Sequence, residues 1–246
     1  MRHRTITLML FFAGLTVAAR ADSLQSGPDQ VPLLELYTSE GCSSCPAADQ
    51  MVSELKDSPD LWTKVIPVAF HVDYWDNLGW KDRMASPEFS ERQRDYVRLC
   101  GSSSPYTPML VHNGKELRRG TVSGKPDQNV GYLKVQQSPT GDFQVTFTPS
   151  SRYAKLYWQL DVALLGFDIV SKVSAGENIG KTLHHDFAVL DHQSKEAFLS
   201  DGVVQASFEI DLHPSALGRR LGLVAWVHQQ GDLPPVQAVG GYLSMK

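Results

Sequence analysis

The sequence predicts an α/β domain followed by a C-terminal all-β domain of the β-sandwich type. In the first half of the 246-residue chain, apolar strand-like runs alternate with segments whose apolar residues recur at helical spacing. Beyond the turn-forming residues 138–141, short strand-like runs follow one another almost without helical spacing. We therefore place the α/β domain at residues 30–138 and the β-sandwich-like domain at residues 141–246.

Residues 1–21 are predicted to be a signal peptide. An apolar run from Ile6 to Ala19 follows two arginines, and Ala19-Arg20-Ala21 has the small-x-small form of a signal peptidase site. A retained membrane anchor is the alternative, but the run is shorter than the roughly 20 residues that span a bilayer. We expect a mature chain that starts at Asp22, keeps no membrane span and resides in the periplasm or outside the cell.

The charge of the chain argues against nucleic-acid binding. There are 23 Lys and Arg residues against 27 Asp and Glu residues. Without the three arginines of residues 1–21 the mature form would hold 20 against 27, a net charge of −7. No cluster of basic residues interleaved with aromatics is present in the sequence, so we expect no nucleic-acid partner. Composition leaves the oligomeric state open.

The α/β domain is predicted to begin with two parallel strands joined by a helix. The apolar segment Val31–Tyr37 is the first strand, and apolar residues at helical spacing predict a helix over Cys45–Lys56. Val65–His71 is a second apolar run with turn residues before it. A right-handed crossover through the helix would place this run parallel to the first strand.

The rest of this domain is predicted to hold a long insert, two helices and a hairpin. Pro87 suits the first turn of a helix because it lacks an N–H, and Gly101 suits the end of that helix. Asn113-Gly114 is a favoured two-residue hairpin turn. In chain order the segments are the insert at 73–86, the helix at 87–100, the hairpin strands at 109–112 and 116–120, and a final helix at 126–137.

The all-β domain is predicted from six strand-like runs divided by turns. The runs cover residues 143–148, 156–164, 186–190, 203–212, 221–227 and 236–243. Residues 176–180 lack the Gly-x-Gly-x-x-Gly form of a nucleotide loop, and His184, His185 and His192 lack the spacing of a zinc site. We therefore expect no cofactor.

One motif prescribes a chemistry, namely Cys42-Ser43-Ser44-Cys45 followed by Pro46. Two thiols this close can exchange electrons as a dithiol/disulfide pair. As a structural bridge the pair would stabilise little, since closing so short a loop removes little chain entropy. Redox exchange is therefore favoured over metal binding and over an inert local disulfide.

The position of the motif gives each sulfur a role. Cys42 lies at the start of the predicted helix, where unpaired N–H groups and the helix dipole favour a negative sulfur. Since a thiolate is the nucleophile in disulfide exchange, we predict Cys42 as the nucleophile and Cys45, one turn along, as the resolving residue. Cys100 falls on the apolar side of its helix and is interpreted as a buried free thiol, with a third redox partner as the alternative.

Three segments are predicted to meet at one edge of the sheet. The C-terminal ends of parallel strands share an edge, which brings Asp73 and Trp75 toward the cysteines. An antiparallel strand at 109–112 would deliver Thr107-Pro108 to the same edge. The predicted substrate-binding residues are Asp73, Trp75, Thr107 and Pro108. The alternative for Trp75 is that it caps a hydrophobic core.

The order strand, Cys-x-x-Cys-Pro, helix, strand, helix, Thr-Pro, hairpin and helix resembles the thioredoxin superfamily over residues 30–137. The resemblance implies a cis-proline at Pro108 that faces the cysteines and leaves the Thr107 backbone free to pair with an extended substrate. Segments 35–46, 71–82 and 106–108 are similar to a narrower group of bacterial secreted thioredoxin-like proteins catalogued as a domain of unknown function. Ser43-Ser44 replaces the Gly-Pro of thioredoxin and the Pro-His of strong periplasmic oxidants, so the direction of electron flow stays open.

We therefore expect an exported thiol–disulfide oxidoreductase that acts on protein or small-molecule thiols and disulfides through Cys42 and Cys45. The first alternative is a periplasmic Cu(I) chaperone, because Cu(I) favours thiolates and His71 would lie at the same edge as the cysteine pair. The second alternative is a non-catalytic binding protein on a thioredoxin-like scaffold, in which the β-sandwich carries the recognition.

Overall fold

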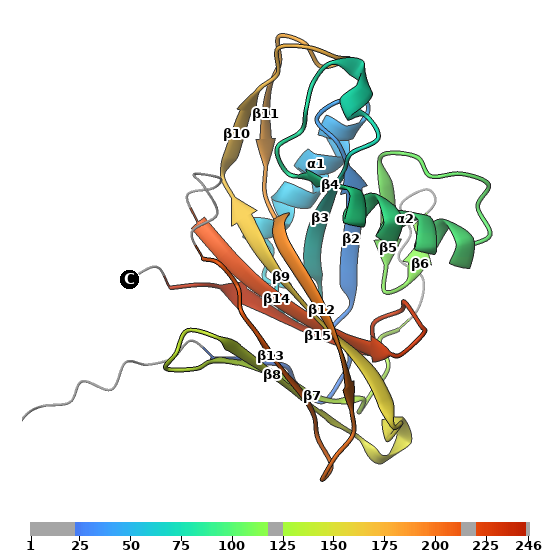
Figure 1. The fold of residues 1–246 in the computed structure, drawn as a ribbon, viewed down its shortest axis with the longest axis vertical. Coiled ribbons are helices and arrows are strands. Elements are labelled where there is room, and N and C mark those ends of the chain that lie inside the picture. Colours follow the sequence, from blue (N-terminus) through green and yellow to red (C-terminus); the bar gives the residue numbers. More distant parts are fainter. Residues whose placement is uncertain (1–22, 118–124, 213–219, 245–246) are drawn as a thin grey trace, which may run out of the picture.

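The computed structural model describes residues 23–117, 125–212 and 220–244 (Figure 1). The predicted signal peptide at residues 1–21 lies outside the described residues, as does part of the predicted hairpin strand 116–120. Neither α-helix of the described ranges is long and apolar enough to cross a bilayer.

The described part of the chain consists mostly of strands. Its α-helices are α1 (Cys45–Ser53) and α2 (Pro87–Leu99), and short 3-10 turns lie at η1 (Glu54–Asp57), η2 (Asp76–Leu78) and η3 (Ser151–Tyr153). The strands are β1 (Ser23–Gln25), β2 (Leu33–Thr38), β3 (Ile66–Val72), β4 (Ala85–Ser86), β5 (Met109–His112), β6 (Lys115–Glu116), β7 (Gly131–Gln137), β8 (Phe143–Pro149), β9 (Tyr157–Phe167), β10 (Ile169–Lys172), β11 (Thr182–His185), β12 (Ala188–Phe198), β13 (Val204–Phe208), β14 (Arg220–Gln229) and β15 (Gln237–Tyr242).

These strands form two sheets and a separate hairpin. The larger sheet has nine strands in the order β15-β14-β9-β12-β3-β2-β5-β6, with β4 paired to β3. The smaller sheet has the order β1-β7-β8-β13. Strands β10 and β11 pair only with each other among the described strands. The smaller sheet packs on the β9, β14 and β15 part of the larger one, whereas α1 and α2 lie beside β2, β3 and β5 (Figure 1).

The predicted fold class, an α/β thioredoxin-like domain followed by a separate all-β domain, is wrong. Strands from both halves of the chain share the nine-stranded sheet, which is mixed rather than parallel. The halves join where Ala188 of β12 pairs with Ala69 of β3, and the Ala69 N–H donates to the Phe187 carbonyl at 2.8 Å. An apolar strand such as β3 needs a partner along its free edge, and here that partner comes from the second half of the chain.

Strand β9 explains why the two halves cannot be separated by pattern alone. Its residues Leu160, Val162 and Leu164 belong to the core between the two sheets. The alternate residues Leu165 and Phe167 belong to the core around β2 and β3. Because successive side chains of a strand point to opposite faces, one continuous apolar strand serves both cores.

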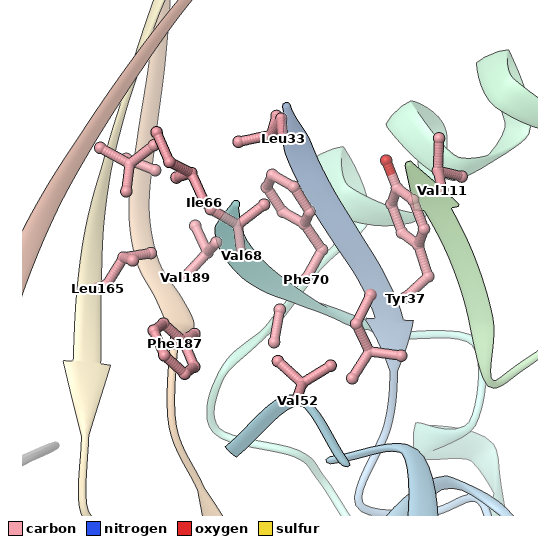
Figure 2. Packing of buried hydrophobic residues seen from close by; sticks show 14 of the residues in the cluster. Leu33, Tyr37, Val52, Ile66, Val68, Phe70, Val111, Leu165, Phe187 and Val189 are labelled. Atoms are coloured by element: carbon pink, nitrogen blue, oxygen red, sulfur yellow. The ribbon is translucent and has the colours of Figure 1, made fainter. Parts of the chain in front are cut away.

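Figure 2 shows the core around β2 and β3 from close by. Phe70 of β3 lies beside Tyr37 of β2, with ring centroids 5.6 Å apart. Val189 of β12 and Leu165 of β9 extend the same cluster on the far side of β3, and Val52 of α1 closes it (Figure 2). Residues more than 100 positions apart are therefore buried together.

Several predicted elements are confirmed. Strands β2 and β3 are parallel from Leu33↔Ile66 to Thr38↔His71, and β5 runs antiparallel to β2. Helix α1 begins at Cys45, and α2 begins at Pro87 with the Ser86 hydroxyl accepting the Glu88 N–H.

The predicted helix at 126–137 is wrong, because residues 131–137 form strand β7. Leu133 and Val135 are buried, whereas Tyr132 and Gln136 on either side of this pair are exposed, which is a period of two rather than of 3.6. The predicted boundary at 138–141 falls in the turn between β7 and β8, which pair from Gly131↔Pro149 to Gln137↔Phe143.

Candidate functional site

The cysteine pair lies where strand β2 turns into helix α1. Cys42 belongs to the connecting segment and Cys45 is the first residue of α1, with Pro46 following in the first turn. Both are thiols, and their side chains are 1% and 0% exposed. The Cys42 sulfur lies 3.3 Å from the Ser44 hydroxyl oxygen and 3.7 Å from the Thr107 carbonyl oxygen. The nucleophile predicted from sequence is thus enclosed by polar groups.

The two thiols differ strongly in acidity. The Cys45 thiol, which donates to the Cys42 sulfur, and to a smaller extent the Ser44 hydroxyl together lower the pKa of Cys42 to about 5 despite burial. The same interaction and burial raise the pKa of Cys45 well above its ordinary value. At neutral pH the pair therefore holds a thiolate at Cys42 and a protonated thiol at Cys45.

The peptide bond between Thr107 and Pro108 is cis, as the resemblance implied. This bond precedes β5, whose antiparallel pairing with β2 brings Thr107 to the end of β2 where Cys42 lies. The structure therefore brings together Cys42, Cys45 and Thr107-Pro108.

Trp75 joins the cysteine segment to the Thr107 segment. Its indole N–H donates to the Thr107 hydroxyl at 2.8 Å. On its other side, a Cβ added at Gly41 would lie 2.9 Å from the Trp75 Cβ, so this position requires glycine. Trp75 also packs against the core around β2 and β3. This packing agrees with the interpretation that Trp75 caps a hydrophobic core, whereas its role in substrate binding stays a prediction.

Asp73, also predicted to bind substrate, is held by helix α2. Its N–H donates to the Ser90 hydroxyl oxygen at 3.0 Å, and the Ser90 hydroxyl donates in turn to the Asp73 carboxylate. This bonding fixes the start of the 73–86 segment against α2.

A cluster of five ionisable side chains lies buried around the cysteine segment, and each is 7% exposed or less. Its members are Glu40, Asp49, His71, Asp82 and His185. The Asp82 carboxylate accepts the Glu40 N–H at 2.9 Å and therefore contacts the segment that carries Cys42. His185 Nε2 lies 3.2 Å from a Glu40 carboxylate oxygen, without hydrogen-bond alignment.

His71 and Asp82 form an ion pair inside this cluster. His71 Nδ1 lies 2.7 Å from the Asp82 carboxylate, and both side chains are 0% exposed. Burial alone would lower the pKa of His71, but the Asp82 charge raises it to about 9. In the same way, His71 overcomes the effect of burial and lowers the pKa of Asp82 to about 2. Within the described ranges, no group of three or more His, Cys, Asp or Glu side chains is arranged to hold a metal ion.

Sequence reasoning missed two residues that contact the cysteine segment from the β10–β11 hairpin. Glu177 accepts the Ser43 N–H at 2.9 Å, and Asn178 donates to the carbonyl oxygens of Glu40 and Cys42. The residues between Gly176 and Gly180 resemble a simple turn. A fully buried asparagine within a glycine-rich turn is the one distinguishing feature, and burial is not visible in the sequence.

Comparison with family models matches residues 33–228 to a family described as "Protein of unknown function (DUF1223)". No match was found among curated proteins. Protein AGR_C_4864 from Agrobacterium tumefaciens is similar in fold, with a TM-score of 0.60 and 21% identity over 86% of this chain and 94% of that one. HBP35 of Porphyromonas gingivalis is similar with a TM-score of 0.61 and 14% identity over 89% of this chain and 76% of that one. At these identities the likeness concerns the fold alone.

Proposed function

The chain belongs to the DUF1223 family of proteins of unknown function, and we propose that it is a thiol–disulfide oxidoreductase that works through Cys42 and Cys45. The observation that supports this proposal most is the geometry of the pair: Cys42 lies just before the first turn of α1, and its sulfur lies 3.3 Å from the Ser44 hydroxyl and 3.7 Å from the Thr107 carbonyl, next to a cis-proline. The pKa values of the two thiols shift in opposite directions within this site. An inert pair would need no such difference, whereas exchange needs one sulfur as a thiolate and the other as a reserve thiol.

The reaction follows from this arrangement. In the reducing direction the Cys42 thiolate attacks one sulfur of a substrate disulfide, the substrate S–S bond breaks, and the other substrate sulfur leaves as a thiolate that takes up a proton. Cys45 then loses its proton and attacks the Cys42 sulfur, which releases the second substrate thiol. The protein becomes the Cys42–Cys45 disulfide, and the substrate gains two electrons from the protein and two protons, one from Cys45 and one from solvent. In the oxidising direction every step reverses.

Thr107-Pro108 and Trp75 are the residues we propose to contact substrate. The Thr107 carbonyl lies against the Cys42 sulfur, so a group bonded to this sulfur would lie beside the Thr107 main chain. Trp75 holds the Thr107 side chain in place. Protein or small-molecule thiols and disulfides are the proposed partners. We also propose an exported location on the basis of residues 1–21, which would place the protein where disulfides persist.

Trapping in cells tests this function directly. In a Cys100→Ser background, Cys45→Ser leaves Cys42 able to attack and removes the thiol that resolves the mixed disulfide. We expect adducts of higher mass that disappear on reduction and that mass spectrometry attributes to Cys42. Cys42→Ser in the same background is the matched control and should form none. Equal adduct levels in the two variants would rule the proposal out.

A further inference from the structure

The β10–β11 hairpin reaches the cysteine segment from a distant part of the chain. It lies beside α1, away from the four-stranded sheet (Figure 1). Its connecting residues 173–181 pack near the 78–80 segment, since a Cβ added at Gly176 would lie 3.6 Å from the Trp80 Cβ. The residues after Val173 therefore belong to the surroundings of the cysteine pair.

Asn178 holds the main chain on both sides of Gly41. Its side chain is fully buried, and its amide nitrogen donates to the Glu40 carbonyl at 2.8 Å and to the Cys42 carbonyl at 2.9 Å. The Lys181 ammonium donates to the Asn178 amide oxygen at 2.8 Å, which fixes the amide so that its NH₂ group faces the cysteine segment. Both hydrogens of one amide are thus used to fix the backbone of the predicted nucleophile.

Glu177 acts on the same segment from the solvent side. Its carboxylate accepts the Ser43 N–H at 2.9 Å, and the Ser43 hydroxyl together with this N–H lowers the pKa of Glu177, which therefore carries a negative charge at neutral pH. Ser43 directly follows Cys42 and precedes α1, so the Glu177 carboxylate adds a negative charge at the end of the helix where N-terminal N–H groups favour a negative sulfur.

We propose that this hairpin is a working part of the redox site, in which Asn178 is a positioning residue for Cys42 and Glu177 opposes the negative charge on the Cys42 sulfur. The inference rests on the proposed function, because a fixed backbone at Cys42 and an adjusted charge on its sulfur matter only if that sulfur reacts. It extends the site to a hairpin that begins more than 120 residues after the cysteines.

The charge on Cys42 depends on other groups, which the test must hold constant. The ionisable side chains of and around the cysteine segment are Cys45 on α1, Tyr74 on the 73–86 segment, Glu177 and Lys181 on the hairpin, and the buried Glu40, Asp49, His71, Asp82 and His185. Substitutions at 177 and 178 leave all of these in place except Glu177 itself. Differences between variants therefore report on the hairpin.

The pH dependence of Cys42 alkylation measures the effect. Reduced protein carrying Cys100→Ser is treated with iodoacetamide between pH 3 and 10, and mass spectrometry reports modification at Cys42 separately from Cys45. Glu177→Gln keeps an acceptor for the Ser43 N–H and removes the negative charge, so the pH at which Cys42 alkylation is half-maximal should fall. The expected fall is roughly 0.3 pH units, because solvent partly screens the charge.

Asn178→Ala should act in the opposite direction. It removes both bonds to the cysteine segment, so the contacts that stabilise the thiolate loosen and the midpoint rises. Exchange with glutathione disulfide should slow about tenfold, since small displacements of a reacting group are costly. Asn178→Asp keeps the size of the side chain but cannot donate, and it should match or exceed the effect of alanine.

Ile179→Ala is the matched control. Ile179 follows Asn178 on the same loop and is 65% exposed, so its loss should change neither midpoint nor rate. The proposal is overturned if Glu177→Gln and Asn178→Ala have the same pH midpoint of Cys42 alkylation as Ile179→Ala. Glu177 is fully exposed, so its variant decides the matter even if Asn178→Ala fails to fold. Alkylation needs no disulfide exchange, so a wild-type protein that does not exchange with glutathione would overturn the proposed function and leave this test valid.

Discussion

At the scale of single residues, the proton between the Cys42 and Cys45 sulfurs stays on Cys45, which leaves Cys42 as the thiolate. Cys42 accepts from the Cys45 thiol and from the Ser44 hydroxyl, and it lies against the Thr107 carbonyl. Serine at position 44 thus has a physical role, since its hydroxyl can donate to the thiolate. The spacing of the cysteines and the shared edge of the parallel strands were sufficient to predict that Cys42, Trp75 and Thr107 meet. The contacts of Asn178 could not be predicted, because they depend on a hairpin whose position follows from tertiary packing.

The buried His71–Asp82 pair makes stability depend on pH. The pKa of His71 is raised in the folded protein to about 9 from about 6.5 in the unfolded chain, so its contribution is fully present below pH 6.5 and is lost as pH rises through 9. The pKa of Asp82 is lowered to about 2, so its contribution is present above pH 4 and is lost as pH falls through 2.

Asp82→Asn should therefore destabilise the protein most near pH 6. We expect a loss of about 3 kcal/mol in the free energy of unfolding, because breaking one partner of a buried pair leaves the other uncompensated. The loss should shrink by pH 9.5, and denaturant unfolding at both pH values measures it. Asp60→Asn, which breaks the exposed pair with Lys64, is the control and should cost little at either pH. An Asp82→Asn cost that does not change between the two pH values would refute the ion pair.

At the scale of elements, strand β12 is what ties the second half of the chain to the first. Its first residues pair with β3, and Phe187 just before it is fully buried. The Phe187 ring packs edge-on against Phe167 at 4.9 Å and against Trp62 at 5.9 Å. The local sequence was sufficient to predict β2, β3, β5 and both helices, because each has apolar residues at a regular spacing and turn-forming or capping residues at its ends. It failed for β7, where a short run of apolar residues fits either period.

Removing the Phe187 ring should weaken the whole molecule. We expect Phe187→Ala to lower the free energy of unfolding by about 3–5 kcal/mol, the usual cost of truncating a buried aromatic side chain. Phe198→Ala, at the other end of β12 and 65% exposed, is the matched control and should cost far less. Urea unfolding monitored by circular dichroism compares the two. If the two variants unfolded at the same urea concentration, the Phe187 ring at the start of β12 would not stabilise this core.

At the scale of the whole molecule, the mixed nine-stranded sheet makes both halves depend on each other. The core around β2 and β3 includes Leu165, Phe167, Val224 and Trp226 from the second half. Sequence reasoning could not predict this arrangement, because turn-rich residues 138–141 look the same between two paired strands as between two domains. The proposed redox site lies on the β2 and β3 part of this sheet, so its geometry relies on strands from the second half.

A chain that ends at residue 140 should therefore not fold on its own. It would leave the β3 edge unpaired and β7 without β8, and it would expose apolar side chains of the shared core. We expect no cooperative thermal transition and strong binding of a hydrophobic dye. A chain that ends at Ser244 is the control and should unfold in one transition. Cooperative unfolding of the shorter chain would show that the first half is autonomous.

The proposed function requires that Cys42 and Cys45 form a reversible redox couple. The most direct measurement equilibrates the Cys100→Ser protein with buffers of varied glutathione and glutathione disulfide ratio, quenches with acid, and determines the oxidised fraction by mass spectrometry. The proposed function predicts one two-electron transition between the dithiol and a Cys42–Cys45 disulfide, reached from either direction, and loss of that disulfide in Cys42→Ser. A wild-type pair that stays in one state across the whole range, and that also fails to exchange with a model disulfide, would contradict it.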